Sequence, residues 1–408
     1  MSTKASIPGH RRDRLAIDGG APVRAEFLPL HRPWIDAADE ASVLETLRSG
    51  WLTTGPKAKQ FERELAAYVG ASHAVGVNSC TAALHLALEA VGVGPGDEVV
   101  TTPVTFAATA NVVCHLGAIP RFVDVEPDTQ NIDPALIEAA ITPKTKAILP
   151  VDFAGLPPDL DPILAIARRH GLPVIEDAAH SIGAEYKGRR IGAIADLTAF
   201  SFYATKNITS GEGGALVTNN AAWAERAQIM GLHGMSRDAW KRYGADGYRH
   251  WDIIGPGYKY NMFDLQAALL LSQFARIEPF WERRRDITMQ LRARFAAVPE
   301  VAVLADRAYA KHAYHLFPIV IRTEQLTADR DTIMAAVQKE NIGIGVHYRA
   351  VHLHPYYSER FGFRRGMFPN AEYYGDRTLS LPFFPKMSDD DVNDVATAVE
   401  KVIAQYRR

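Results

Sequence analysis

Short apolar runs alternate with helical segments through the first half of the chain. The apolar runs predict strands at 73–77, 98–101, 121–125, 146–151, 174–176, 197–202 and 215–218. Helical segments are predicted at 38–49, 59–69, 82–91, 106–116, 134–141 and 160–170. This alternation predicts an α/β fold with a mainly parallel, seven-stranded sheet and helices on both faces. Ligands of such sheets bind at the carboxyl ends of the strands.

The pattern changes near residue 220. A helix to about 232 precedes a polar, aromatic stretch, 233–260, which predicts a long loop. Further helices are predicted at 264–275, on to 295 after a break near Pro279, at 329–339 and at 389–405, with strands near 314–321 and 343–348. We therefore expect an N-terminal arm (1–30), a large α/β domain (31–263), and linking helices with a small C-terminal α+β domain (264–408).

Composition and charge narrow the class of protein. The 408 residues are 47% hydrophobic with a net charge of −2, so the chain can bury a large core but lacks the positive charge of a nucleic-acid or membrane-surface binder. Two cysteines, Cys80 and Cys114, are too few for a disulfide framework and suit a reducing compartment. No secretory signal is evident, and no apolar run reaches the roughly 18 residues of a membrane span. We expect a cytoplasmic protein without a metal site.

The stretch LTAFSFYATKNITSGEGGALVTN, residues 197–219, sets one lysine between two predicted strands. Lys206 lies on a loop that continues into the glycine-rich run SGEGG. Partial burial lowers the pKa of a lysine from its usual value of about 10.4, and the neutral amine is the form that makes a Schiff base. We hypothesise that Lys206 binds pyridoxal phosphate covalently; the alternative is an ordinary solvated lysine.

Polar residues follow other predicted strands at the same edge of the sheet. The run NSCTA, 78–82, leads into a helix whose first N–H groups could hold a phosphate, although its serine could simply cap the helix. Asp177 could pair with the protonated pyridine nitrogen of the cofactor or could cap the next turn. His180, three residues on, could meet the phenolic oxygen or could be a structural histidine.

Two further residues complete the set. Phe106 could stack on the cofactor ring, although a lone aromatic residue more often belongs to a core. Ser201, five residues before Lys206, could reach a phosphate. Together these residues supply a lysine, a pyridine partner, a ring stack and a phosphate cradle, which are the parts of a pyridoxal phosphate site.

The motifs that carry these residues resemble the DegT/StrS family of sugar aminotransferases, which have fold type I. They are EDAAH (176–180), FSFYATKN (200–207), GEGG (211–214), TTGP (53–56), TFAATAN (105–111) and GPGYKYN (255–261). The resemblance runs from about Ile17 to the C-terminal helix. Within the family, the text around the lysine, GPGYKYN and HYRAVH (347–352) are most similar to enzymes that aminate C4 of UDP-4-keto sugars, such as the UDP-4-amino-4-deoxy-L-arabinose aminotransferase.

The resemblance implies a role for individual residues at the cofactor. Lys206 would be the Schiff-base lysine and proton shuttle, and Asp177 would lie at the pyridine nitrogen. Phe106 would stack on the ring, and His180 would lie near the phenolic oxygen. The expected phosphate contacts are Thr81, Ala82 and Ser201, with Asn261 reaching the phosphate in the neighbouring subunit of an obligate homodimer.

The expected sugar-nucleotide contacts are Thr54, Tyr258, Lys259, His347, Tyr348 and Arg349, for which a solvated loop is the alternative. Two positions depart from the family pattern. Cys80 stands where many members have glycine, which affects the phosphate cradle. Asp152 belongs to a triplet, VDF, that replaces a more usual histidine-containing one, so contacts near the sugar are expected to differ.

The implied reaction is a ping-pong transamination with glutamate as the expected amino donor and a nucleotide-linked keto sugar as acceptor. Other members aminate C3 of dTDP-keto sugars or keto-cyclitols, and these reactions remain open. Pyridoxamine-dependent sugar dehydration is less consistent with this chain, because those relatives replace the lysine with histidine. A regulatory or sensor protein with the same fold is the non-catalytic alternative.

Overall fold

The computed structural model describes residues 14–236 and 251–408. Residues 1–13 of the predicted arm and 237–250 of the predicted long loop lie outside the described residues. The described parts of that loop, 233–236 and 251–260, contain isolated bridges but neither a helix nor a strand.

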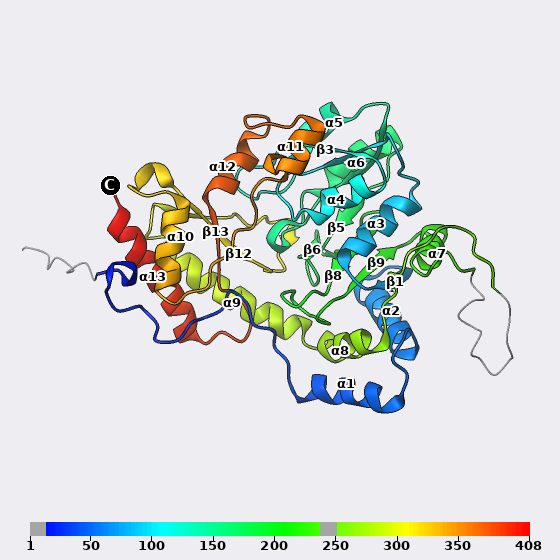
Figure 1. Ribbon diagram of the computed structural model, residues 1–408, viewed down its shortest axis with the longest axis horizontal. Helices are drawn as coiled ribbons and strands as arrows, with labels where there is room; N and C mark the ends of the chain where they lie inside the picture. The colour runs from blue at the N-terminus through cyan, green and yellow to red at the C-terminus, as the bar shows by residue number, and fades with distance from the viewer. Residues whose placement is uncertain (1–13, 237–250) are drawn as a thin grey trace, which may run out of the picture.

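A seven-stranded sheet forms the centre of the larger part of the molecule (Figure 1). Its strands are β1 (His73–Val77), β2 (Glu98–Thr101), β3 (Ile119–Phe122), β4 (Thr145–Leu149), β5 (Ile175–Asp177), β8 (Leu197–Ser201) and β9 (Gly214–Thr218). They run in the order β1-β9-β8-β5 and β4-β2-β3, and parallel bridges from Ile148 to Val174 and from Val151 to Asp177 join the two sets. β9 is antiparallel to both neighbours, while the other described pairs are parallel.

Helices cover both faces of this sheet. They are α2 (Pro56–Val69), α3 (Cys80–Ala90), α4 (Ala108–His115), α5 (Pro134–Ala140), α6 (Leu160–His170) and α7 (Ala221–Met230), while α1 (Ala37–Ser49) packs on α8 (Asp264–Phe274). Successive residues of β9 reach opposite faces, as the pleat requires. Leu216 packs in a core with α3 and α7, whereas Ala215 and Val217 pack with α2 and α8. The predicted α/β architecture with a mainly parallel sheet is confirmed.

The C-terminal part has its own antiparallel sheet, in the order β10-β12-β13. Its elements are α9 (Ile277–Phe295), β10 (Val301–Val303), β12 (Phe317–Ile321), α10 (Arg330–Lys339), α11 (Pro355–Phe361), α12 (Pro369–Arg377), β13 (Thr378–Leu381) and α13 (Asp389–Tyr406). Three short strands, β6 (Glu185–Tyr186), β7 (Arg189–Arg190) and β11 (Ala310–Lys311), form a separate ribbon that connects the two parts. In Figure 1, α10 and α13 lie at the opposite end of the molecule from α7.

The N-terminal segment packs on this C-terminal part. Leu15 and Leu28 belong to its hydrophobic core, and Leu28 pairs with Ile342 in an isolated parallel bridge. The carboxylate of Glu340 accepts hydrogen bonds from the backbone N–H groups of Ala16 and Val23, both at 2.9 Å. The domain boundaries at 30/31 and 263/264 stay predictions.

Two details of the C-terminal half differ from the prediction. Residues 343–348 do not form a strand, because their ladder contact is limited to the pair Gly345–Ser380. The break between α8 and α9 falls at 275–276 rather than at Pro279. Pro279 is the third residue of α9, where its missing N–H has no partner to lose within the helix. Among the described helices, none has the length and apolar character of a membrane span.

Gly214 marks the closest approach between β9 and the start of α3. A Cβ atom at this position would lie 2.3 Å from the carbonyl carbon of Ser79 and 2.5 Å from the nitrogen of Cys80. We predict that Gly214→Ala lowers the free energy of unfolding by about 1 to 3 kcal/mol, because backbone atoms must move apart. Urea denaturation measures this change. Gly94→Ala is the control, since nothing lies within 4 Å of its Cβ position; equal stability of the two variants would contradict the prediction.

Candidate active site

The carboxyl ends of two neighbouring parallel strands define the site. Asp177 is the last residue of β5, and Ser201 is the last residue of β8. The two strands pair in parallel from Ile175–Leu197 to Asp177–Ala199. The segments that follow them therefore leave the sheet at the same edge. Lys206 follows five residues after Ser201, in the turn that leads to β9.

Asp177 is a buried carboxylate with several donors around it. Its Oδ2 accepts a 2.7 Å hydrogen bond from the hydroxyl of Thr109, and its Oδ1 accepts one from the N–H of Ala179 at 3.2 Å. The thiol of Cys80 lies 3.9 Å from Oδ1. Burial raises the pKa of Asp177, and the bond from Thr109 acts against that shift. Cys80, which replaces the family's usual glycine, therefore contacts the carboxylate.

Lys206 lies close enough to Asp177 for their charges to interact. Burial lowers the pKa of Lys206 to about 8, and the charge of Asp177 acts in the opposite direction. About a tenth of the amine is therefore neutral at pH 7, and about half at pH 8. This is the state that nucleophilic attack on an aldehyde requires.

Four histidines surround the lysine. Burial lowers the pKa of His31 to about 3 and of His347 to about 4, and it lowers those of His180 and His315 well below the usual value. The positive charge of Lys206 lowers all four further. The rings of His180 and His315 lie 4.4 Å apart, and all four imidazoles are neutral at pH 7.

His31 and His315 were not found from the sequence, because their contacts with the site come from segments far away along the chain. Asn207 provides one such link: its Oδ1 lies 3.1 Å from Nδ1 of His315, and its Nδ2 donates to the carbonyl of Ala313 at 2.9 Å. Thr109 lies within the TFAATAN motif, but nothing in its spacing pointed to Asp177. Tertiary structure alone brings these residues together.

The start of α3 lies beside β9. Ser79 is the N-cap of this helix, and its hydroxyl accepts a 3.1 Å bond from the N–H of Ala82. The helix cap by Ser79, which the sequence allowed as the alternative to a phosphate site, is therefore present. Thr81 is half-buried in the first turn, where the helix dipole favours an anion. Ser201 is 7% exposed.

Phe106 and the HYRAVH segment lie at the open side of the cluster. Phe106 is 63% exposed, so it does not belong to the hydrophobic core. Its ring centre lies 6.1 Å from that of Tyr348. The hydroxyl of Tyr348 lies 3.4 Å from Nε2 of His180. Nδ1 of His347 lies 2.8 Å from the hydroxyl of Ser380. Arg349 is exposed and donates to the carbonyl of Leu353, so its guanidinium is turned away from this group.

The remaining predicted contacts form a second group beside β1. Nδ2 of Asn261 donates to the hydroxyl of Thr54 at 2.7 Å. The ring of Tyr258 lies 4.7 Å from that of His85 on α3, and Lys259 is exposed. Within the described chain, these contacts connect the second group with β1, α2 and α3 rather than with the lysine cluster.

Asp152 lies in the interior, not at the surface of the site. It accepts a hydrogen bond from the hydroxyl of Ser181 and contacts the side chain of Glu176, which in turn accepts a bond from Thr198 at 3.2 Å. One oxygen of Asp152 and one of Glu176 contact no donor in the described chain. A proton shared between the two carboxyl groups satisfies both oxygens.

Comparison with known proteins assigns the chain to a family. Residues 33–400 match the DegT/DnrJ/EryC1/StrS aminotransferase family. The chain belongs to this family. It is 50% identical to the spore coat polysaccharide biosynthesis protein SpsC of Bacillus subtilis over 381 residues, 93% of this chain and 98% of SpsC.

Solved structures of other sugar aminotransferases superpose on this family member. Putative sugar aminotransferase Spr1654 of Streptococcus pneumoniae, in its PMP form, is 34% identical with a TM-score of 0.87, covering 93% of this chain and 99% of that one. Helicobacter pylori PseC, an aminotransferase involved in the biosynthesis of pseudoaminic acid, is 30% identical with a TM-score of 0.86, covering 93% and 100%. The chain is therefore a sugar aminotransferase of fold type I that uses pyridoxal phosphate.

The residues present fit this cofactor. Asp177 is a buried carboxylate that forms no ion pair with an arginine of the described chain, Phe106 exposes its ring near Tyr348, and α3 begins beside β9 with a serine cap. Nδ1 of His180 contacts no protein donor or acceptor in the described chain, which leaves it available to a ligand. In residues 14–236 and 251–408, no group of three or more His, Cys, Asp or Glu side chains is arranged to hold a metal ion.

The buried acid pair makes stability depend on pH. Burial raises the pKa of Asp152, and it raises the pKa of Glu176 to about 7. Because both values are raised, the stabilisation is complete below the unfolded pKa of about 4 and is lost as pH rises through 7. We predict that Asp152→Asn reduces this alkaline loss by more than about 1 kcal/mol.

Urea denaturation between about pH 4 and pH 9, a range that includes the raised pKa of Glu176, measures this effect. Asp161→Asn is the control, because that carboxylate is exposed on α6 and pairs with Lys187 at the surface. An identical pH dependence of unfolding in wild type and Asp152→Asn would show that the pair shares no proton.

Proposed function

We propose that this enzyme transfers an amino group from glutamate to C4 of a UDP-linked 4-keto sugar. The observation that carries the proposal is the position of the HYRAVH segment, which sets Tyr348 against His180 beside Lys206. This segment carries the similarity to C4 aminotransferases of UDP-keto sugars. SpsC and PseC, whose names refer to polysaccharide and pseudoaminic acid biosynthesis, support a sugar acceptor of this general class.

We assign the cofactor contacts as the motifs suggest. Lys206 would bind pyridoxal phosphate covalently, and Asp177 would hold its pyridine nitrogen. Phe106 would lie against its ring and His180 beside its phenolic oxygen. The phosphate would be bound by Thr81, Ala82 and Ser201. When bound, the cofactor supplies a carbonyl carbon that accepts the amino group and a ring that withdraws electrons.

Lys206 is the group suited to move a proton at this site. Its pKa of about 8 lets the Nζ atom take up and release a proton near neutral pH. The surrounding histidines titrate far below this range, so they do not compete with the lysine as bases. The hydroxyl of Thr109 donates to Asp177 and so favours the ionised form of this carboxyl group against the effect of its burial.

The second group of residues supports a homodimer with composite sites. Asn261 and Thr54 bond to each other at β1, away from the lysine cluster of their own chain. We propose that Asn261 and Thr54, together with Tyr258 and Lys259, contact the cofactor or substrate bound in the active site of the neighbouring subunit. His347 and Tyr348 would contact the sugar nucleotide from the same chain, and Arg349 would do so only by leaving its hydrogen bond to the carbonyl of Leu353.

We also propose a cytoplasmic location. Both Cys80 and Cys114 are free thiols in the structure, which suits a reducing compartment. Amination of C3 of a dTDP-keto sugar or of a keto-cyclitol is the second candidate reaction, and the choice of acceptor separates the two.

Spectroscopy of the purified enzyme tests the proposal. We predict a visible absorption band of the bound cofactor that disappears when glutamate is added and returns when a UDP-4-keto sugar follows. Lys206→Ala should lose this response and at least about a thousandfold in turnover, because it removes both the nucleophile and the proton carrier. Lys187→Ala, which removes an exposed lysine, is the matched control. Return of the band with a dTDP-3-keto sugar alone would favour the second candidate, and no response to glutamate would refute the donor assignment.

Burial lowers the pKa of Lys206, and the charge of Asp177 raises it in part, so Asp177 affects the pH at which Lys206 reacts. The rate of pyridoxal phosphate binding to the apoenzyme should rise with pH and reach half its maximum near pH 8, where the amine is half neutral. Because Asp177 raises the pKa of Lys206, Asp177→Asn should move this midpoint to lower pH. Stopped-flow absorbance gives both midpoints. A midpoint that moves upward, or that moves equally in Asp161→Asn, would contradict the pairing.

A further inference from the structure

Helix α12 packs directly against the backbone of the HYRAVH segment, residues 347–352. The hydroxyl of Tyr374 donates to the carbonyl of His347 at 2.9 Å. The next residue, Gly375, has no side chain. A Cβ atom there would lie 3.0 Å from the backbone nitrogen of Ala350 and 3.1 Å from the carbonyl oxygen of Tyr348. The helix therefore supports the segment at the residues that face the lysine cluster.

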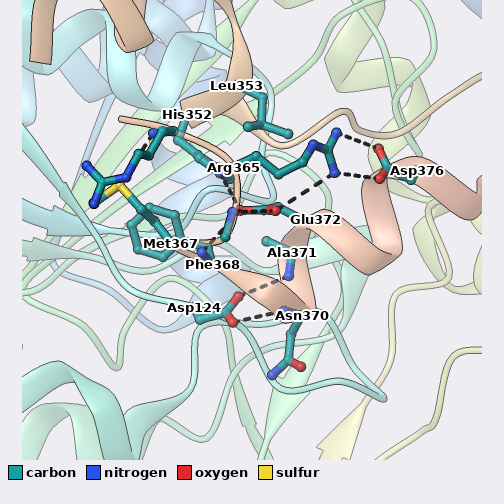
Figure 2. A network of polar contacts seen from close by, with 12 residues as sticks. Asp124, His352, Leu353, Arg365, Met367, Phe368, Asn370, Ala371, Glu372 and Asp376 are labelled. Carbon is teal, nitrogen blue, oxygen red and sulfur yellow. Dashed lines mark hydrogen bonds and ion pairs between the residues drawn. The ribbon is translucent and has the colours of Figure 1, made fainter. Parts of the chain in front are cut away.

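A buried hydrogen bond between His352 and Glu372 joins the segment to this helix (Figure 2). Nε2 of His352 lies 3.0 Å from Oε1 of Glu372, and the two side chains are 0% and 8% exposed. A carboxylate only accepts, so the imidazole carries its proton on Nε2 and donates it. Burial lowers the pKa of His352, which keeps the ring neutral.

Glu372 also orders the chain that precedes α12. Its carboxylate accepts hydrogen bonds from the N–H groups of Gly366, at 2.8 Å, and Phe368, at 3.3 Å. The guanidinium of Arg365 lies 3.8 Å away but is mostly exposed and is bound to Asp376 at 2.7 Å. The buried carboxylate of Glu372 thus binds both the residues that precede α12 and the last residue of the HYRAVH segment.

Asp124 fixes the same helix to the large sheet. It follows β3, and its two oxygens accept from the N–H groups of Asn370 and Ala371 in the first turn of α12, at 2.9 and 3.0 Å (Figure 2). The side chain of Asn370 returns a 2.8 Å bond to the carbonyl of Val125. Capping of a helix by a carboxylate from another element stabilises both its N-terminus and its position.

We infer that His352 and Glu372 are positioning residues that hold Tyr348 and His347 in place at the lysine cluster, with Asp124 as the anchor of α12 on the sheet. Neither side chain contacts the lysine cluster itself; each acts through the backbone of the segment. The role of this segment in sugar-nucleotide binding rests on the proposed function. The hydrogen bonds that hold the segment against α12 do not depend on that function.

Variants of His352 in the full-length, cofactor-loaded enzyme test the inference. His352→Leu removes the donor, whereas His352→Gln keeps an N–H near the position of Nε2 and is the matched control. Loss of the donor leaves Glu372 short of a partner, so amides in 345–352 should exchange with deuterium about tenfold or more faster, with exchange in β5 and β8 unchanged. His352→Gln should restore most of the protection.

Kinetics give the second readout. In His352→Leu, the KM for the keto sugar should rise by about tenfold or more, while bleaching of the cofactor band by glutamate keeps its wild-type rate. His352→Gln should stay near wild type in both. A rise in KM that His352→Gln shares fully would mean that ring packing, not the hydrogen bond, is responsible, and would overturn the inference.

The two hypotheses fail in different ways. If wild type does not respond to glutamate, the proposed function fails, and the exchange measurement still decides the positioning role. Wild-type exchange and wild-type KM in a folded His352→Leu would overturn the positioning role alone. Should that variant not fold, Glu372→Gln, which converts one acceptor oxygen into a donor, is measured in the same way with the same criteria.

Discussion

Exclusion of water from the carboxyl edge of the sheet is the constraint on which this active site depends. Asp152, Glu176 and Asp177 are all buried there, within one or two strands of one another. Burial disfavours every charged form, so each group adopts the state that costs least. Burial raises the pKa values of Asp152, Glu176 and Asp177, lowers those of the histidines, and brings that of Lys206 to about 8. The reactivity of Lys206 therefore follows from packing, because burial is what lowers the pKa of its amine to about 8 and lets it lose a proton near neutral pH.

The same edge explains why so many segments meet at one point. β5 and β8 end together because they are parallel neighbours, and this brings Asp177 and Lys206 to the same side. The C-terminal part then covers the open side with the segment around Tyr348. Because that segment lacks a ladder of its own, its position depends on side chains from α12 and β13. The sheet thus positions the residues that react with the cofactor, while a loop held by hydrogen bonds covers them on the side where the acceptor is proposed to bind.

Much of this arrangement was predictable from the sequence, and the exceptions have a common physical origin. All seven strands of the large sheet overlap their predicted ranges, because buried parallel strands are short apolar runs that local pattern detects well. The position of Asp177 at a strand end followed from the same pattern. His31 and His315 could not be predicted, since their neighbours in sequence carry no signal and only tertiary contacts bring them to Lys206. The error at 343–348 is of the same kind: its composition suits a strand, but within it only Gly345 forms a β-bridge, to Ser380.

The N-terminal segment has a consequence for how the polypeptide is made. Leu15 and Leu28 share a core with α13, Arg24 forms ion pairs with Asp391 and Asp394, and Glu340 ties the segment to Lys401. The contacts of Ala16, Val23 and Arg24 with Glu340 and Asp394 join residues more than 300 positions apart, so the C-terminal part must wait for nearly the whole chain to leave the ribosome. Until then the apolar residues at the front of the nascent chain have no native partner, whereas the strands of the large sheet are already complete. The two ends of the gene are therefore coupled in biogenesis, and a truncation at either end exposes the core that the other end was to cover.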